Sequence, residues 1–122
     1  MRTVITADIL TMARVLAALS GPERAACLAV VMDHADLAHK VSKRLGHPDP
    51  RWGDGSLTSA AGGLPRLREP LGLDPDYLES LALVAATLAW RARRDERTRK
   101  ANRRKKASRL KGLPLSPPAP VC

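Results

Sequence analysis

The sequence predicts an all-α protein: a small bundle of three main helices and one short helix, followed by a basic C-terminal helical extension and a Pro-rich tail. Two observations carry this prediction. Apolar residues recur at helical spacing in three segments, and residues that start or stop helices stand at the junctions. Phe is absent, Tyr occurs once and Trp twice. The core must therefore consist of Leu, Ala, Val, Ile and Met.

The first helix is expected in "TADILTMARVLAALS", residues 6–20. Thr6 is placed as the N-cap, and Asp8 lies in the first turn, where a carboxylate suits the helix dipole. The pattern predicts an end near Ser20 and one apolar face formed by Ile9, Met12, Ala13, Leu16 and Leu19.

The second helix is expected to follow directly and to reach about Leu45. "SGPE" has the form of a capping box, with Ser20 as the cap, Glu23 three residues later and Pro22 in the first turn. Gly46 suits the position after a helix, and His47-Pro48 prevents its continuation. The two helices should form an antiparallel hairpin. The predicted apolar face comprises Cys27, Val31, Ala35, Ala38, Val41 or Ser42, and Leu45.

The loop "HPDPRWGDGSL", residues 47–57, precedes a short helix stopped by Gly62-Gly63. A structural role is favoured, with Trp52 as a central packing residue inserted between the helices. Gly53 and Gly55 would permit backbone conformations closed to other residues, and Asp54 and Ser56 would cap the short helix. A docking surface, an anion site at "GDGS" and catalysis are alternatives. The residues assigned to this structural or docking loop are His47, Arg51, Trp52, Gly53, Asp54, Gly55 and Ser56.

The last main helix is expected to begin with Asp74 as its cap, Pro75 at its first position and Asp76 in its first turn, after an irregular segment at 64–73. No Gly or Pro interrupts the chain from there to Gly112, so the helix should extend, fraying beyond about residue 100. The expected divisions are a helical domain at 1–92, a basic extension at 93–111 and a disordered tail at 112–122. The predicted buried stripe is Leu78, Leu81, Ala82, Ala85, Leu88, Ala89 and Ala92.

Charge is distributed unevenly along the chain. Residues 1–90 have a net charge of −1, whereas residues 91–122 have a net charge of +10. A basic segment of this kind indicates contact with a polyanion, with nucleic acid ahead of an acidic protein or an anionic membrane. A solvated tail without a binding role is the remaining alternative. The residues expected to contact nucleic acid are Arg93, Arg94, Arg97, Arg99, Lys100, Arg103, Arg104, Lys105, Lys106, Arg109 and Lys111.

The sequence disfavours both a metal site and an enzyme active site. Asp33, Asp36 and His39 have spacings that could share a helix face, and carboxylates with a histidine suit a divalent cation. However, Asp36 and Lys40 make an ordinary i, i+4 ion pair, and no second acidic helix follows to complete a cage. No nucleophile has a visible base. We therefore expect no metal, no cofactor and no catalytic residue.

The cysteines and the longest apolar run indicate the cellular location that we expect for the protein. Cys27 and Cys122 make no disulfide framework, so both thiols are expected to be free in a reducing cytoplasm. "LALVAATLAW", residues 81–90, is too short to span a bilayer. The expectation is a soluble cytoplasmic protein, and the small core would benefit from homo-oligomerisation.

The order of these features resembles a small, uncharacterised helical family found mainly in alphaproteobacteria. Its mark is a motif of the His-Pro-x-Trp-Gly-x-Gly-[Ser/Thr]-Leu type, which here reads "HPDPRWGDGSL", with Asp49-Pro50 lengthening the stretch between His47 and Trp52. The resemblance covers about residues 1–92 and leaves the basic extension outside. It implies an association with phage-derived gene transfer agents, and it implies no activity.

The sequence thus favours a small non-enzymatic accessory protein that contacts nucleic acid, most simply DNA, through its basic arm with little sequence specificity. The alternative is a protein–protein adaptor or regulator that docks through its helical domain, with a phage-like or gene transfer agent particle as the candidate setting.

Overall fold

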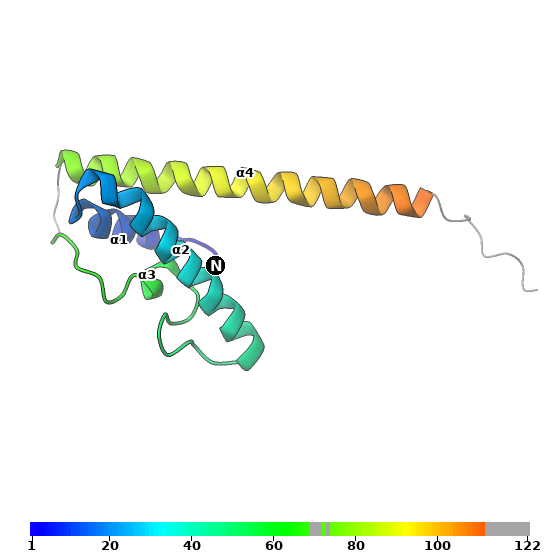
Figure 1. Cartoon of the computed structure of the whole chain (residues 1–122), viewed down its shortest axis with the longest axis horizontal. Coiled ribbons are helices and arrows are strands. Elements are labelled where there is room, and N and C mark those ends of the chain that lie inside the picture. The colour runs from blue at the N-terminus through cyan, green and yellow to red at the C-terminus, as the bar shows by residue number, and fades with distance from the viewer. Residues whose placement is uncertain (69–71, 73, 112–122) are drawn as a thin grey trace, which may run out of the picture. The chain divides into compact units, whose positions relative to one another are not determined.

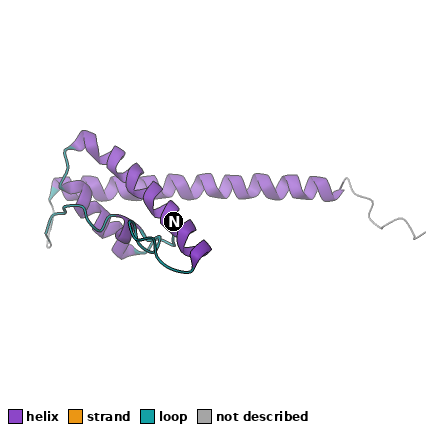
Figure 2. Cartoon of the chain, turned by 60° about the horizontal axis from the view of Figure 1, so that its bottom comes forward, coloured by secondary structure: helices purple, strands orange, loops and turns teal. Residues whose placement is uncertain are grey.

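A computed structural model describes residues 1–68, 72 and 74–111. It contains helices α1 (Thr6–Ala17), α2 (Gly21–Leu45), α3 (Leu57–Ala60) and α4 (Pro75–Lys111) (Figure 1). Figure 2 shows these helices joined by loops, with no strand among the described residues. The all-α prediction is confirmed. The Pro-rich tail at 112–122, including Cys122, lies outside the described residues.

Two compact units divide the chain, one at residues 1–87 and the other from Leu88 onward. The boundary lies inside α4, five residues before the end expected for the helical domain. In the first unit, α3 contacts both α1 and α2, and α1 contacts α2. The short helix therefore completes the packing of the α1–α2 hairpin.

Helix α1 begins one residue earlier than expected. Its N-cap is Ile5, and the Asp8 Oδ2 accepts the Ile5 N–H at 3.0 Å. This bond draws residue 6 into the first turn, so the expectation of Thr6 as the N-cap is wrong. The helix ends at Ala17 with Ala18 as its C-cap, short of the predicted Ser20.

Helix α2 has the predicted bounds but not the predicted capping box. Ser20 is the N-cap, yet its side chain makes no capping hydrogen bond. The Glu23 N–H instead donates to the Ser20 backbone carbonyl at 3.0 Å. At the other end, Gly46 adopts a left-handed φ of 74°, and its N–H donates to the Ser42 carbonyl. The predicted glycine stop is confirmed.

The core of the first unit is aliphatic, as the composition predicts. It buries parts of the expected faces of α1 and α2, but Ile9, Leu19 and Cys27 are only half-buried and Leu45 is exposed. No aromatic side chain belongs to it among the described residues. The buried apolar residues are Met12, Ala13, Val15, Leu16, Ala17, Leu28, Val31, Met32, Ala35, Ala38, Leu57, Ala61 and Val84.

Helix α4 begins as predicted but buries a different face in its first turns. The Asp74 Oδ1 accepts the Tyr77 N–H at 3.1 Å, which caps the helix. Ser80 and Val84 are buried, whereas Leu78 is 41% exposed and Ala82 and Ala85 are exposed. The expected stripe is therefore wrong by about one position. Apolar residues occur on several sides of this segment, so periodicity does not single out the packed side.

The distal part of α4 is also more regular than predicted. It remains helical through Lys111, against the expectation of fraying beyond residue 100. Residues of high helix propensity fill the segment, and no Gly or Pro occurs before Gly112. No helix in the described part of the chain has an apolar stretch long enough to cross a bilayer.

Candidate functional site

The loop between α2 and α3 is closed by a buried aspartate. Asp49 is 5% exposed, and its Oδ1 accepts the Arg51 N–H at 2.7 Å and the Trp52 N–H at 3.3 Å. The Asp49 and Gly53 backbones exchange two hydrogen bonds, of 2.8 and 2.9 Å. Side chains of this type commonly stabilise tight turns in this way. Residues 49–53 therefore form a small, fixed turn that carries Arg51 and Trp52.

Two glycines let this loop lie directly on the helices. Gly53 and Gly55 have φ values of 83° and 94°, which L-amino acids other than glycine rarely adopt. A Cβ on Gly53 would lie 2.5 Å from the Ser59 Cβ, and one on Gly55 would lie 2.6 Å from the His39 Cα. The predicted role of both glycines is confirmed, and the close approach to α2 and α3 explains it.

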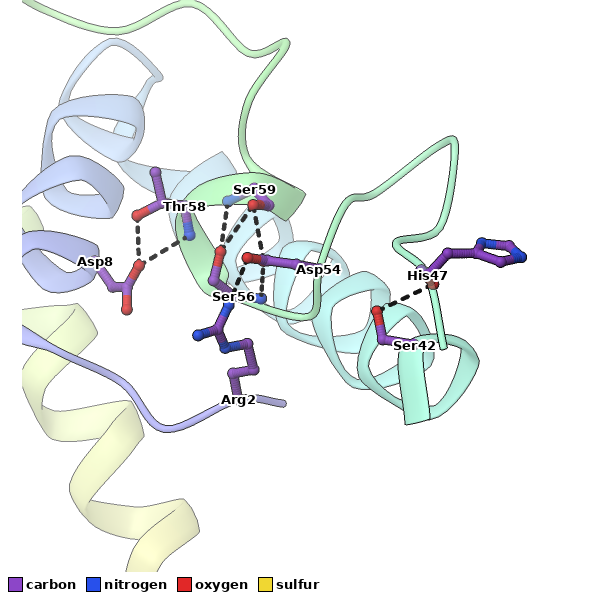
Figure 3. A network of polar contacts seen from close by, with 8 residues as sticks. All are labelled: Arg2, Asp8, Ser42, His47, Asp54, Ser56, Thr58 and Ser59. Carbon is purple, nitrogen blue, oxygen red and sulfur yellow. Dashed lines mark hydrogen bonds and ion pairs between the residues drawn. The ribbon is translucent and has the colours of Figure 1, made fainter. Parts of the chain in front are cut away.

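A polar network holds the start of α3 (Figure 3). The Asp54 Oδ1 accepts the Ser56 N–H and the Ser59 hydroxyl, both at 3.0 Å, and its Oδ2 pairs with Arg2. The Ser56 Oγ caps α3 by accepting the Ser59 N–H at 3.1 Å. The hydrogen bond from the Ser56 backbone, with further bonds from Ser56 and Ser59 and the nearby Arg2 charge, lowers the pKa of Asp54 to about 2. The predicted caps are confirmed.

The same network bears on the alternative of an anion site at "GDGS". The Thr58 N–H and hydroxyl both donate to Asp8 on α1. The N–H groups of Ser56, Thr58 and Ser59 are thus all bonded within the protein, so they are not free to bind an anion.

His47, the first residue of the loop, is exposed. Its backbone carbonyl accepts the Ser42 hydroxyl at 3.4 Å (Figure 3).

Trp52 lies at the surface of the first unit, so its prediction as a central packing residue is wrong. Its half-buried ring stacks on His34 of α2, with centroids 4.1 Å apart and planes 14° apart. The Arg51 guanidinium carbon lies 4.3 Å from the Trp52 ring centroid. Aliphatic side chains already fill the interior, and the Asp49 turn places Trp52 outside it.

A cavity of about 570 Å³ opens beside this stack. Helix α2 forms one wall, and the end of α3 with the residues after it forms another. Burial raises the pKa of the Cys27 thiol, which lines the α2 wall. The lining residues are Ala26, Cys27, Val30, Val31, His34, Arg51, Trp52, Ala60, Gly63 and Leu64. We call this cavity the Trp52 pocket.

The three residues weighed as metal ligands are not gathered into a site. No group of three His, Cys, Asp or Glu side chains within the described ranges is arranged to hold a metal ion. Asp36, expected to pair with Lys40, lies 2.7 Å from the Met1 amino group. The pKa of His39 is lowered, and partial burial is the largest cause. The positive charges of the Met1 amino group, Lys43 and Arg2 lower it further.

The basic residues expected to contact nucleic acid all lie on α4 in the second unit, and every one is exposed. Glu96 pairs with Lys100 at 3.3 Å, in the favourable i, i+4 order. The Asp95 carboxylate lies 3.5 Å from the Arg94 guanidinium. From Arg97 to Lys111 the helix carries nine Lys/Arg and no acidic residue. Asn102, Lys105, Lys106 and Arg109 share one face of it.

Sequence reasoning missed two residues that the structure makes prominent. Arg24 is 7% exposed, and its Nε donates to the carbonyls of Leu16 and Leu19. Arg24 lies four residues before Leu28, which is on the buried face of α2, and this spacing would have indicated that Arg24 lies on the same face. Trp90, in the second unit, is 61% exposed, with the Arg94 guanidinium carbon 5.2 Å from its ring centroid.

Comparison with known proteins yields one family match. No curated protein and no solved structure matches the chain significantly. The family model described as "Domain of unknown function (DUF7742)" matches residues 2–88, which is most of the chain. The match ends at the boundary between the two compact units, so the basic part of α4 lies beyond it. The expectation of a family without an assigned function agrees with this match, and the chain belongs to the DUF7742 family.

Proposed function

We propose that this protein is a non-enzymatic accessory factor that contacts nucleic acid through the basic part of α4, with little sequence specificity. The observation that carries the proposal is the run of nine exposed Lys/Arg between Arg97 and Lys111, uninterrupted by any acidic residue. At 1.5 Å per residue, the segment from Arg93 to Lys111 is about 28 Å long. Duplex DNA presents one phosphate charge per about 1.7 Å of its axis, so several phosphates lie within that length.

The distribution of the cations favours phosphate contact over base reading. Successive residues of a helix are turned by about 100°, so the basic positions surround the helix. Such an arrangement neutralises backbone charge but presents no single face of hydrogen-bonding groups to the bases. No aromatic residue lies within Arg93–Lys111 to stack on single-stranded bases. A duplex is therefore favoured over a single strand, and duplex DNA is the simplest candidate.

The test is binding to a short labelled DNA duplex, measured by fluorescence anisotropy over a range of salt concentrations. If about six phosphates are neutralised, the slope of log K against log salt is about −5. Affinity would then fall about 10³-fold between ~50 and ~200 mM salt. Weak binding at physiological salt, or a slope near zero, would contradict the proposal.

A pair of matched variants locates the contact. The triple change R104Q, K105Q and K106Q removes three cations from the basic part of α4 while retaining good helix formers. It should reduce the magnitude of the slope of log K against log salt by about 2 to 3. The control removes three exposed cations from α2 by K40Q, K43Q and R44Q, and should leave the slope unchanged. An equal loss in both variants would assign binding to overall charge instead of to the arm.

The second candidate function is a protein–protein adaptor or regulator that docks through the helical domain, with a phage-like or gene transfer agent particle as the candidate setting. The exposed Arg51 and half-exposed Trp52 beside an apolar pocket favour it, because such side chains are common at binding hot spots. Partner capture that survives the arm variant R104Q/K105Q/K106Q but is lost on changing Arg51 to Ala would support this candidate over the first.

A further inference from the structure

The Trp52 pocket has the size and lining of a small-molecule site. Its volume of about 570 Å³ lies within the range of about 300–1,000 Å³ usual for such sites. Val30 and Leu64 are 51% and 37% exposed there, so aliphatic surface that could be buried faces solvent. The His34–Trp52 stack closes one side with aromatic surface. These features favour an apolar ligand body.

The pocket also carries a cation at its rim. Arg51 is the permanently charged residue of the lining, and its side chain is 70% exposed. The Asp49 Oδ1 lies 3.8 Å from the Arg51 Nε, but the same oxygen already accepts two backbone N–H groups. The guanidinium carbon lies 4.3 Å from the Trp52 ring centroid, and the exposed side chain keeps donors available to a ligand. A planar guanidinium is well suited to pair with a carboxylate.

We propose that the Trp52 pocket binds a small apolar molecule with one carboxylate group, with the apolar part against Val30, Val31 and Leu64 and the carboxylate paired with Arg51. This site belongs to residues 1–87 and shares no residue with the basic arm. The inference goes beyond the proposed contact with nucleic acid, and either can fail without the other.

Three ligands with the same number of carbon atoms separate the contributions of the apolar body and of the charged group to binding affinity. They are octanoate, 1-octanol and octylammonium. Binding is measured by tryptophan fluorescence on the full chain carrying W90F, so that Trp52 is the sole tryptophan. Octanoate should bind about three- to tenfold more tightly than octanol, because a hydrogen bond to a charged group adds to the same apolar burial. Octylammonium should bind least tightly, because its cation faces Arg51.

Substitutions then assign the two halves of the ligand. R51Q should lower the affinity for octanoate to that for octanol while leaving octanol unaffected. V30F should fill part of the cavity and weaken both ligands. L37F is the matched control, since Leu37 is also exposed on α2, at 43%, but does not line the pocket. It should change neither affinity.

The outcomes that would overturn the proposal are distinct from one another. No saturable response to millimolar octanoate would reject the site itself. Equal affinity for all three ligands, or an advantage of octanoate that persists in R51Q, would reject the role of Arg51. Circular dichroism of each variant checks that the helical fold is retained, so a loss of binding reports on the pocket.

Discussion

Both its backbone conformation and its surroundings make Gly55 difficult to replace. Its φ of 94° is strained for any other residue, and a Cβ would lie 2.6 Å from the His39 Cα. Gly46 shares the first problem, with a φ of 74°, but has nothing within 4 Å of a Cβ. Gly63 has neither problem. The three positions thus separate backbone strain from steric overlap.

Replacing each glycine with alanine should therefore give three different losses in the free energy of unfolding. We expect about 2–5 kcal/mol for G55A, from strain plus a backbone clash. G46A should cost about 1 kcal/mol, and G63A should stay within about 0.5 kcal/mol of zero. Urea unfolding followed by circular dichroism measures all three. A G55A protein as stable as G46A would mean that the loop does not lie against α2 as the structure has it.

Asp54 makes part of the stability depend on pH. Its pKa is about 2 in the folded protein against 3.8 ordinarily, chiefly because of the hydrogen bond from the Ser56 N–H. Above about pH 5 the carboxylate is ionised in both states and its contribution is complete. As pH falls from about 5 to about 2, the unfolded chain takes up the proton first, so the contribution declines.

The variant D54N keeps an oxygen that can accept the Ser56 N–H but cannot titrate. The difference in unfolding free energy between wild type and D54N should therefore be greatest near neutral pH and shrink as pH approaches 2. Because the Asp54 side chain is 40% exposed, solvent screens its charge and the difference will be modest. Urea titrations at a series of pH values measure it. A difference that is constant with pH would contradict the assignment.

At the scale of the elements, Arg24 joins three helices of the first unit. Its Nε donates to carbonyls at the end of α1 at 3.0 and 3.3 Å, and its terminal nitrogens pair with Asp76 and Glu79 at the start of α4. The arginine itself lies at the start of α2. A helix C-terminus presents carbonyls without partners, and Arg24 supplies them with a donor.

R24M removes the donor and the charge while keeping a long side chain, and should cost about 2–4 kcal/mol of unfolding free energy. R24K keeps the charge near α4 but loses the guanidinium Nε–H, so its cost should be intermediate. The double change D76N and E79Q should cost less than about 1 kcal/mol, because both carboxylates are largely exposed. Thermal and urea unfolding compare them. If the double change matched R24M, the ion pairs and not the carbonyl bonds would account for the effect.

Most helix ends could be predicted, because the signals that set them are local. Asp74, Ser56 and Gly46 act on residues within four positions of themselves, and each does so as expected. The prediction was wrong where several local solutions compete. At α1, Asp8 reaches back to Ile5 and moves the cap by one residue. At α4, apolar residues occur on several sides, and the predicted stripe is displaced by about one position from the face that buries Ser80 and Val84.

In the whole molecule, three boundaries lie at nearly the same position: the end of the first compact unit, the end of the family match and the start of the basic segment. The first unit ends at Thr87, the family match ends at residue 88, and the net positive charge begins at Arg91. The basic part of α4 therefore lies outside the matched domain. The proposed nucleic-acid contact belongs to that part of the helix, and the proposed ligand pocket belongs to the matched domain.

The sequence by itself determined the helical class, most helix ends and the separation of charge, because each depends on composition or on residues close together in the chain. It also predicted unusual backbone conformations at Gly53 and Gly55, but the close approach of Gly55 to His39 of α2 came from the tertiary structure. Only the tertiary structure decided that Trp52 stacks on His34 outside the core, that Arg24 is buried, and that Cys27, Trp52 and Leu64 share one pocket. These features depend on which residues distant in sequence meet when the helices pack. Neither propensity nor spacing specifies that, since both act within a few residues along the chain.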